Sequence, residues 1–207
     1  MAELYVGGVF EDAAQRDFLT GLLERMARLA GHDLFLEPRL TNGCRFDFLG
    51  HHLCDLASHT VGIVVGVDGK KESPAQKSAS MSKRTPESLV ELNVLWSVAC
   101  PSIEAWMIAD VGAVPAVLQD IYGLTVRRCT PPTVPKAEGR AKGALSQWVA
   151  ELLGEPLLRG GREHAREIGA ALRPEHISPS RHPDLRELLD RRIPEFLVRC
   201  ARGGGSR

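Results

Sequence analysis

The chain of 207 residues lacks a long apolar run. Its best apolar stretch, residues 61–67, has the length of a strand and falls far short of the ~18–20 residues of a membrane-spanning helix. The first residues also lack the basic segment and apolar core that are typical of a secretion signal. We therefore expect no membrane association and a cytoplasmic location.

Cysteine is scarce and scattered. The five cysteines are odd in number and contain no C-x-x-C pair, which favours reduced thiols in a cytosol over a disulfide framework. Histidine and cysteine cluster only in residues 51–59. A structural zinc usually joins ligands from a knuckle or from separate elements, so we interpret this cluster as the polar surface of a helix, with zinc as the alternative.

Several motifs of nucleotide-binding and hydrolytic enzymes are absent. No G-x-x-x-x-G-K-[ST] run is present, so the chain carries no Walker P-loop of its own. Gly7 and Gly8 lack the third glycine of a dinucleotide fingerprint, and the G-x-S-x-G elbow of many serine hydrolases is missing. An enzyme built on this chain would use another chemistry.

The chain has no net charge, but this zero is the sum of two opposite parts. Residues 1–126 carry a net charge of −6, and residues 127–207 carry +6. The arginine excess of the second part suits a nucleic acid or an acidic partner. Only 11 aromatic residues are present, and none is interleaved with the basic runs, so binding to a nucleic acid would be directed at its backbone and sensitive to salt.

Strands alternate with helices in the first part of the sequence, which predicts an α/β fold with a mostly parallel, Rossmann-like sheet and helices on both faces. The expected strands are residues 4–9, 34–36, 61–67 and 92–99, and the first expected helices are 11–31 and 46–58. Pro38 limits the second strand, and residues 69–87, which show no periodicity, predict a long mobile loop.

The second part of the sequence reads differently. From Lys136 onward only helices are expected, and Pro194 should kink or end the last of them. We therefore predict one structural domain, in which residues 1–126 form an α/β core and residues 127–207 form a helical C-terminal extension packed on it.

Three acidic residues fall where strands of a parallel sheet would end. Glu11 follows the first strand, Asp68 follows the third, and Glu104 begins the helix that Ser102 would cap after the fourth. Ligands of open parallel sheets bind beyond these carboxyl ends. Carboxylates that converge there suit Mg²⁺ or Mn²⁺ and phosphoryl-transfer chemistry. The alternative, for Glu11 and Glu104, is that they only complement a helix dipole.

Four segments of the sequence carry a resemblance to a known family. They are, in chain order, Tyr5-Val6-Gly7-Gly8, Asn42-Gly43-Cys44-Arg45, Ile63-Val64-Val65-Gly66-Val67-Asp68 and Pro101-Ser102-Ile103-Glu104-Ala105-Trp106-Met107-Ile108-Ala109-Asp110. Together they resemble small Toprim-like proteins that are often encoded beside an AAA- or ABC-type ATPase and are distant kin of overcoming-lysogenization-defect family nucleases. Because Pro135-Lys136, Arg173-Pro174-Glu175 and residues 184–189 also look like the C-terminal part of that family, the resemblance covers nearly the whole chain.

The resemblance implies a Toprim-like sheet and a metal-dependent nuclease, or nuclease subunit, of an ATPase-associated anti-phage defence system. In this hypothesis the three acidic residues at the strand ends, Glu11, Asp68 and Glu104, would bind Mg²⁺ or Mn²⁺, and Asp110 would support them. Lys70 or Lys71 would stabilise phosphate charge. Catalysis would then depend on Asp68, Glu11, Glu104 and Lys70, with an AAA- or ABC-type ATPase as partner.

The sequence departs from the Toprim pattern at two positions. Toprim proteins hold Mg²⁺ with a glutamate at the end of the first strand and an Asp-x-Asp pair after a later one. Gly7 stands where that glutamate is expected, and Lys70 stands in place of the second aspartate. Fewer carboxylates weaken metal binding, and a lysine opposes a second cation. The alternative function is therefore a catalytically degenerate Toprim domain that binds nucleic acid or a partner ATPase without cutting.

Basic residues follow Asp68 closely. Residues 70–84 contain five basic side chains against one acid, Glu72. A cationic loop beside an acidic site can clamp a phosphodiester backbone, whereas the alternative is a solvated surface loop. The residues expected to contact nucleic acid are Lys70, Lys71, Lys77, Lys83, Arg84 and Arg45.

Overall fold

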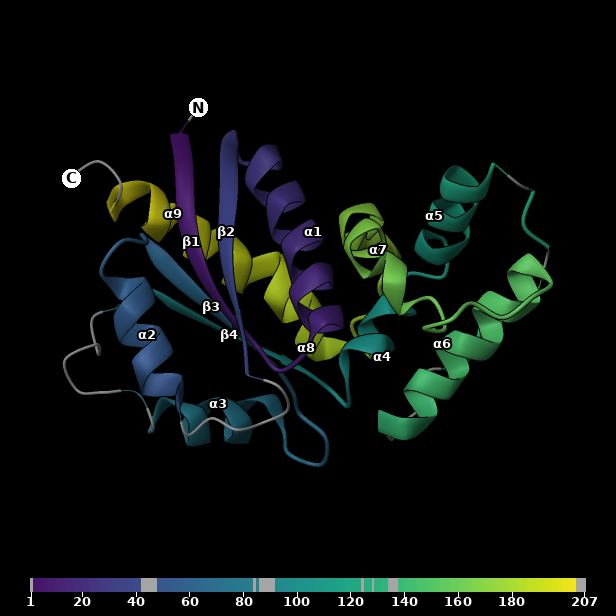
Figure 1. Ribbon diagram of the computed structural model, residues 1–207, viewed down its shortest axis with the longest axis horizontal. Helices are drawn as coiled ribbons and strands as arrows, with labels where there is room; N and C mark the ends of the chain where they lie inside the picture. The colour runs from purple at the N-terminus through teal and green to yellow at the C-terminus, as the bar shows by residue number, and fades with distance from the viewer. Residues whose placement is uncertain are drawn as a thin grey trace.

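A four-stranded sheet forms the centre of the protein, and all its neighbouring strands are parallel, in the order β2-β1-β3-β4 (Figure 1). The computed structural model describes residues 2–41, 48–83, 85, 92–123, 125–127, 129–133 and 138–203. The strands are β1 (Ala2–Phe10), β2 (His32–Leu40), β3 (Gly62–Asp68) and β4 (Val94–Ala99). The predicted α/β class with a parallel sheet is confirmed.

Helices cover both faces of this sheet. The helices are α1 (Ala13–Leu29), α2 (Leu49–Ala57), α3 (Pro74–Ser82), α4 (Ile103–Met107), α5 (Ala113–Tyr122), α6 (Glu138–Leu153), α7 (Ala165–Ala171), α8 (Pro183–Glu187) and α9 (Ile193–Gly203). One buried apolar cluster joins α2 and α3 to one face, and a larger cluster joins α1 and α9 to the other (Figure 1). No helix among the described residues is long and apolar enough to cross a membrane.

The strand β3 is the most deeply buried element of the sheet. All seven of its residues are buried, because helices pack on both of its faces, and this explains its almost wholly apolar sequence. It pairs with β1 on one side and with β4 on the other. Asp68, its last residue, therefore lies in the middle of the carboxyl edge of the sheet.

The second strand is longer than predicted and contains Pro38. In β2, which pairs with β1 along its whole length, Pro38 lies opposite Gly8. Proline has no N–H to donate, but β2 is an edge strand, and one side of an edge strand makes no sheet hydrogen bonds. The prediction that Pro38 limits the strand was wrong because it took no account of where the strand lies in the sheet.

The segment predicted as a mobile loop contains the helix α3. Gln76 N donates to Ser73 Oγ at 3.3 Å, and Ser73 N donates to Gln76 Oε1 at 3.0 Å, which makes a capping box. Pro74 follows at the first helical position, where its fixed backbone angle suits a helix start. The side chain of Met81, near the end of α3, is buried against the sheet. The loop prediction was wrong because it weighed the missing apolar period above this capping signal.

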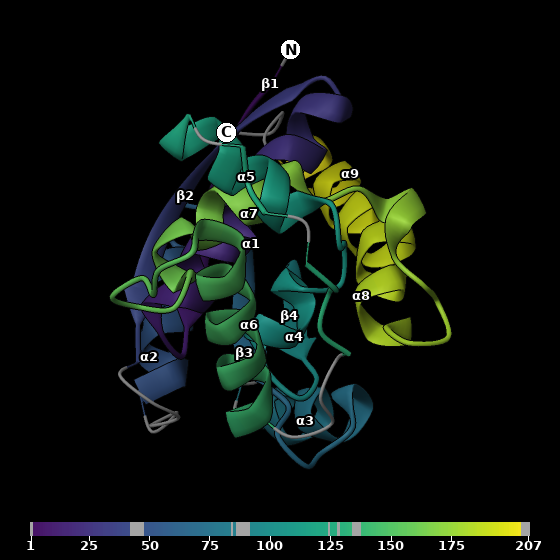
Figure 2. The same cartoon turned by 90° about the vertical axis from the view of Figure 1, so that its right-hand side faces the viewer.

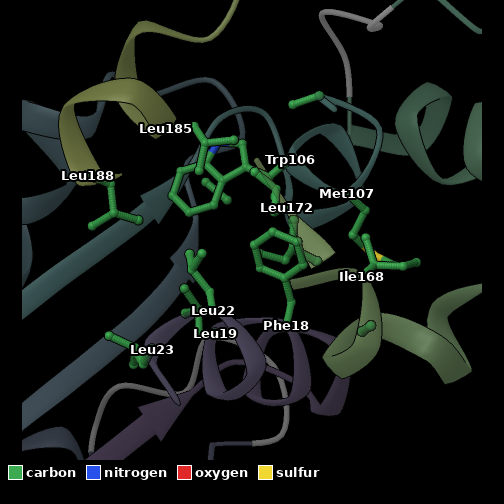
Figure 3. Packing of buried hydrophobic residues seen from close by; sticks show 14 of the residues in the cluster. Phe18, Leu19, Leu22, Leu23, Trp106, Met107, Ile168, Leu172, Leu185 and Leu188 are labelled. Carbon is green, nitrogen blue, oxygen red and sulfur yellow. The ribbon is translucent and has the colours of Figure 1, made fainter. Parts of the chain in front are cut away.

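The C-terminal helices pack on the core through one continuous cluster of buried apolar side chains. Phe18 of α1, Trp106 of α4 and Ile168 of α7 meet in this cluster (Figure 3), and α7 lies between α1 and α5 (Figure 2). Pro194 does not end the last helix, because α8 continues through a π-helical segment, Leu188–Arg192, into α9. The division of the chain at residue 126 stays a prediction.

We expect Gly→Ala to destabilise the protein where α1 and α7 are in close contact and to stabilise it at an open position of α6. A Cβ on Gly21 would lie 2.0 Å from the carbonyl oxygen of Arg166, and one on Gly169 would lie 2.2 Å from that of Phe18. Because backbone must move, we expect Gly21→Ala to lower the free energy of unfolding by about 2 kcal/mol. Gly143 lies in α6, and outside this helix no atom of the described residues lies within 4 Å of an added Cβ, so Gly143→Ala should raise it by about 1 kcal/mol. Urea unfolding of both variants measures this, and equal shifts would contradict the packing.

Candidate functional site

The three acidic residues predicted at the strand ends converge at the carboxyl edge of the sheet. Glu11 follows β1 directly, Asp68 is the last residue of β3, and Glu104 lies in the first turn of α4, after β4. All three side chains are buried, and Glu104 is buried completely. They come together because β1, β3 and β4 run in the same direction and therefore end at the same edge.

Hydrogen bonds fix the carboxylate of Asp68. Gln15 Nε2 donates to its Oδ1 at 2.8 Å, and Ile103 N donates to the same oxygen at 3.0 Å. Asp68 N in turn donates to Glu11 Oε2 at 3.2 Å, and Glu11 N donates to Gln15 Oε1 at 3.1 Å. Gln15, which the sequence analysis missed, thus ties the ends of β1 and β3 together. Its signal in the sequence is an amide one helical turn after Glu11, on the otherwise apolar face of α1.

Burial is the main cause that raises the pKa of Asp68 from its ordinary value of 3.8 to about 7, and the nearby charges of Glu104 and Glu11 contribute to this rise. The hydrogen bonds from Gln15 and from the backbone of Ile103 act in the opposite direction. Asp68 therefore exchanges a proton near neutrality. A buried carboxyl group with such a pKa, among other carboxylates, is typical of functional sites.

Glu104 is held by a serine and an arginine. Ser102 Oγ donates to Glu104 Oε2 at 2.7 Å, so that Ser102 serves the glutamate and makes no capping bond to the helix. Arg162 Nε lies 2.9 Å from Glu104 Oε1, and Arg162 Nη2 lies 2.5 Å from Asp12 Oδ2. Glu104 Oε1 accepts no hydrogen bond from any residue that the structure describes, so its contact with Arg162 is an ion pair without hydrogen-bond geometry.

Lys70 lies beside Glu11. Its Nζ is 3.2 Å from Glu11 Oε1. The backbone of Lys70 has a φ of 56°, in the left-handed region that costs a side chain like lysine about 1 kcal/mol or more. Two hydrogen bonds hold this turn: Gly69 N donates to Ala99 O at 2.7 Å, and Lys70 N donates to Pro101 O at 3.0 Å. These backbone hydrogen bonds therefore fix the position of Lys70 at the site.

The arrangement does not fit a bound divalent metal ion. Carboxylate oxygens are the right donors for Mg²⁺, but Lys70 lies on Glu11, Arg162 lies on Glu104, and two N–H groups occupy one oxygen of Asp68. Within the part of the chain that the structure describes, no group of three or more His, Cys, Asp or Glu side chains is placed to hold a metal ion. Among the described residues, Lys70 and Arg162 supply positive charge beside these carboxylates.

Asp110, expected to support the metal ligands, has other partners. Its fully buried carboxylate accepts hydrogen bonds from Gly112 N at 2.9 Å and from Arg173 N at 3.0 Å, and His176 Nδ1 lies 3.3 Å away. These contacts join the segment after α4 to the segment after α7. A role for Asp110 beside the three carboxylates stays a prediction.

The lysines that follow Asp68 have different environments. Lys71 and Lys83 are exposed, whereas Lys77 Nζ lies 2.9 Å from Glu72 Oε2. Arg84 and Arg45 lie outside the described residues.

No family model, curated protein or solved structure matches the chain. The carboxylates and the cations beside them therefore carry the functional assignment.

The raised pKa of Asp68 predicts a pH dependence of stability that Asp68→Asn removes. Between pH ~4 and ~7 the folded protein keeps a proton that the unfolded chain releases, so the free energy of unfolding falls as the pH rises through this window. The variant carries no such proton, so its stability relative to the parent should rise from pH 5 to pH 8. Urea unfolding at each pH measures the difference. Asp120→Asn, an exposed position on α5, should follow the parent, and parallel curves for Asp68→Asn and the parent would refute the expectation.

Loss of Arg162 should destabilise the protein far more than loss of an exposed arginine. Arg162→Gln leaves Glu104 buried without its cation, which should lower the free energy of unfolding by about 3 kcal/mol. Arg166→Ala breaks an exposed ion pair with Glu24 and should lower it by less than about 1 kcal/mol. The double variant Glu104→Gln/Arg162→Met buries no charge and should recover most of the loss. Urea unfolding measures all three, and equal effects of the single variants would contradict the role of Arg162.

Proposed function

We propose that this chain is a Toprim-like domain that binds the phosphate backbone of a nucleic acid at the carboxyl edge of its sheet and does not cut it by itself. One observation carries the proposal: Lys70 and Arg162 lie on the buried carboxylates of Glu11 and Glu104. A metal-dependent nuclease needs these carboxylates to bind its metal ion, whereas in this chain they form ion pairs with Lys70 and Arg162.

Exposed lysines next to this edge support binding to a backbone. Lys71 follows Lys70 directly, and Lys83 ends α3, which packs against β4 beside the same edge. Both side chains are exposed, so they are open to phosphate groups. Recognition by such lysines depends on charge and carries little sequence information.

A second candidate is a Mg²⁺- or Mn²⁺-dependent nuclease, or nuclease subunit, of an ATPase-associated anti-phage defence system. The pKa of Asp68, raised to about 7 by burial among two other carboxylates, favours this candidate, because catalytic sites hold such groups. Both candidate functions include an AAA- or ABC-type ATPase as partner. A cytoplasmic location suits both as well, since the four cysteines that the structure describes are free thiols.

Incubation of the purified protein with labelled DNA and RNA, in Mg²⁺ or Mn²⁺, separates the two candidates. The protein alone, and together with an ATPase encoded beside it, should bind without cleavage, and its affinity should fall between 50 and 200 mM salt. The double variant Lys71→Glu/Lys83→Glu should lower the slope of log affinity against log salt by about two. Fluorescence anisotropy measures the affinities.

Two further variants decide what each result means. Arg28→Glu/Arg202→Glu reverses two exposed charges in the last turns of α1 and α9. The carboxyl ends of these two helices lie far from α3 (Figure 1), so this variant should leave the salt slope close to that of the parent. An equal loss of affinity in this control would refute binding at the carboxyl edge. Metal-dependent cleavage that Asp68→Asn abolishes would establish the second candidate in place of the first.

A further inference from the structure

A cavity of about 410 Å³ lies beside the carboxyl end of β4, between the start of α3 and the start of α8. The two helices cover opposite faces of the sheet: Met81 of α3 belongs to the apolar cluster on one face, and Leu185 of α8 belongs to the cluster on the other. They meet beyond β4, the last strand of the sheet on this side, and enclose the cavity there. Its volume is in the range of ligand sites, about 300 to 1,000 Å³.

The lining of this cavity combines apolar walls with a few charged groups. The apolar walls come from the start of α3 and the start of α8, and are Pro74, Ala75 and Pro183. The charged groups are two carboxylates and one guanidinium, those of Asp184, Glu187 and Arg181. Apolar walls with a small number of placed polar groups are typical of a site that holds a small molecule or one ring of a larger ligand.

The carboxylate of Asp184 is held in position at this cavity. Cys100 N donates to its Oδ2 at 3.2 Å, and Trp106 Nε1 donates to the same oxygen at 2.9 Å. Both of these bonds from described residues use Oδ2, which leaves Oδ1 for a ligand. Glu187, by contrast, forms an ion pair with Arg191. Asp184 is therefore the prepared acceptor of the cavity.

The charges of the cavity select the kind of group that can enter it. Two carboxylates repel a phosphate group, so the backbone of a nucleic acid stays outside. Burial raises the pKa of the Cys100 thiol, which also lines the cavity, to about 11, so this thiol is neutral at pH 7 and is not an activated nucleophile. A flat, uncharged ring with an amino group fits these conditions, because carboxylates accept hydrogen bonds from the amino groups of nucleobases.

The cavity lies next to the lysines to which we assign the phosphate backbone. Lys71 precedes Ser73, which lines the cavity, by two residues, and two residues of chain span at most about 7 Å. Lys83 ends the helix α3, which forms one wall. A base attached to a phosphate at Lys71 is therefore within reach of the cavity.

We propose that this cavity takes up an unpaired base with an exocyclic amino group, such as cytosine, from the nucleic acid bound at the sheet edge. Asp184 Oδ1 accepts a hydrogen bond from the amino group, the apolar walls contact the faces of the ring, and the exposed Arg181 contacts the adjacent phosphate. The proposal rests on the proposed function, because it requires a backbone held at Lys71 and Lys83. It adds a preference for single strands, since a base stacked in a duplex cannot enter such a pocket.

Fluorescence anisotropy with three labelled single strands of equal length tests the proposal. The strands are oligo-deoxycytidine, oligo-thymidine and a strand of abasic sites with the same phosphates. The parent protein should bind the cytidine strand about tenfold more tightly than the abasic strand, which is the effect of one hydrogen bond to a charged group. It should also prefer cytidine to thymidine, because thymine has acceptor oxygens on both sides of its ring N–H and the carboxylate repels them.

Two variants of the lining test the cavity and its acceptor separately. Ala75→Phe, at an exposed position, fills the cavity and should abolish both preferences, while the slope of log affinity against log salt stays at the parent value. Asp184→Asn keeps an oxygen for the N–H groups of Cys100 and Trp106 and presents an amide N–H₂ group to the ligand. Because this group donates to thymine O4, the preference should shift from cytidine towards thymidine.

The controls separate this pocket from other sources of base preference. Ser80→Phe, also exposed and on another face of α3, should keep the parent's preferences, and free deoxycytidine monophosphate should compete weakly, because it lacks the neighbouring phosphates. Equal affinity of the parent for cytidine and abasic strands, an equal loss in Ser80→Phe, or a free nucleotide that binds as tightly as the strand overturns the proposal. None of these results touches the salt-dependent binding of the backbone, whereas affinity that does not change with salt refutes the proposed function.

Discussion

The pairing of buried carboxylates with cations from elsewhere in the chain is the constraint on which this structure depends. The parallel sheet brings Glu11, Asp68 and Glu104 to one buried edge, where unpaired charges are strongly unfavourable. The turn after β3 supplies Lys70, and the segment before α7 supplies Arg162. Because Arg162 also contacts Asp12, at the start of α1, the C-terminal helices complete the electrostatics of the sheet as well as its apolar core.

The same constraint accounts for much of the charge division along the chain. Several ion pairs join a basic residue of the second part to an acidic residue of the first: Arg162 with Asp12 and Glu104, Arg166 with Glu24, and Arg173 with Asp110. These basic residues face acidic partners of their own chain. The opposite net charges of the two parts therefore reflect internal complementarity, and the case for a nucleic-acid surface rests on the exposed lysines beside the sheet edge.

Local patterns in the sequence predicted the carboxyl ends of β1, β3 and β4 to within one residue, but not that of β2. Asp68 is the clearest example, since the burial of β3 on both faces leaves its last residue at the carboxyl edge. Arg162 had no such signal, because its partners Asp12 and Glu104 lie far away in the sequence and meet it only after the C-terminal helices have packed. The helix α3 could have been predicted, because the capping box at Ser73 and Gln76 is visible in the sequence. Gln15 could not, because a single amide on an apolar helix face does not identify a site residue.

Burial, together with the charges at the sheet edge, explains why the pKa of Asp68 lies near neutrality. Lys70 offsets Glu11, and Arg162 offsets Glu104, whereas the hydrogen bonds that Asp68 accepts from described residues come from uncharged donors, Gln15 and the N–H of Ile103. Burial, together with the charges of its two acidic neighbours, raises the pKa of Asp68 to about 7. A divalent cation entering this edge must displace a protein cation and the proton of Asp68. A phosphate group that approaches Lys71 from solvent would displace neither of them.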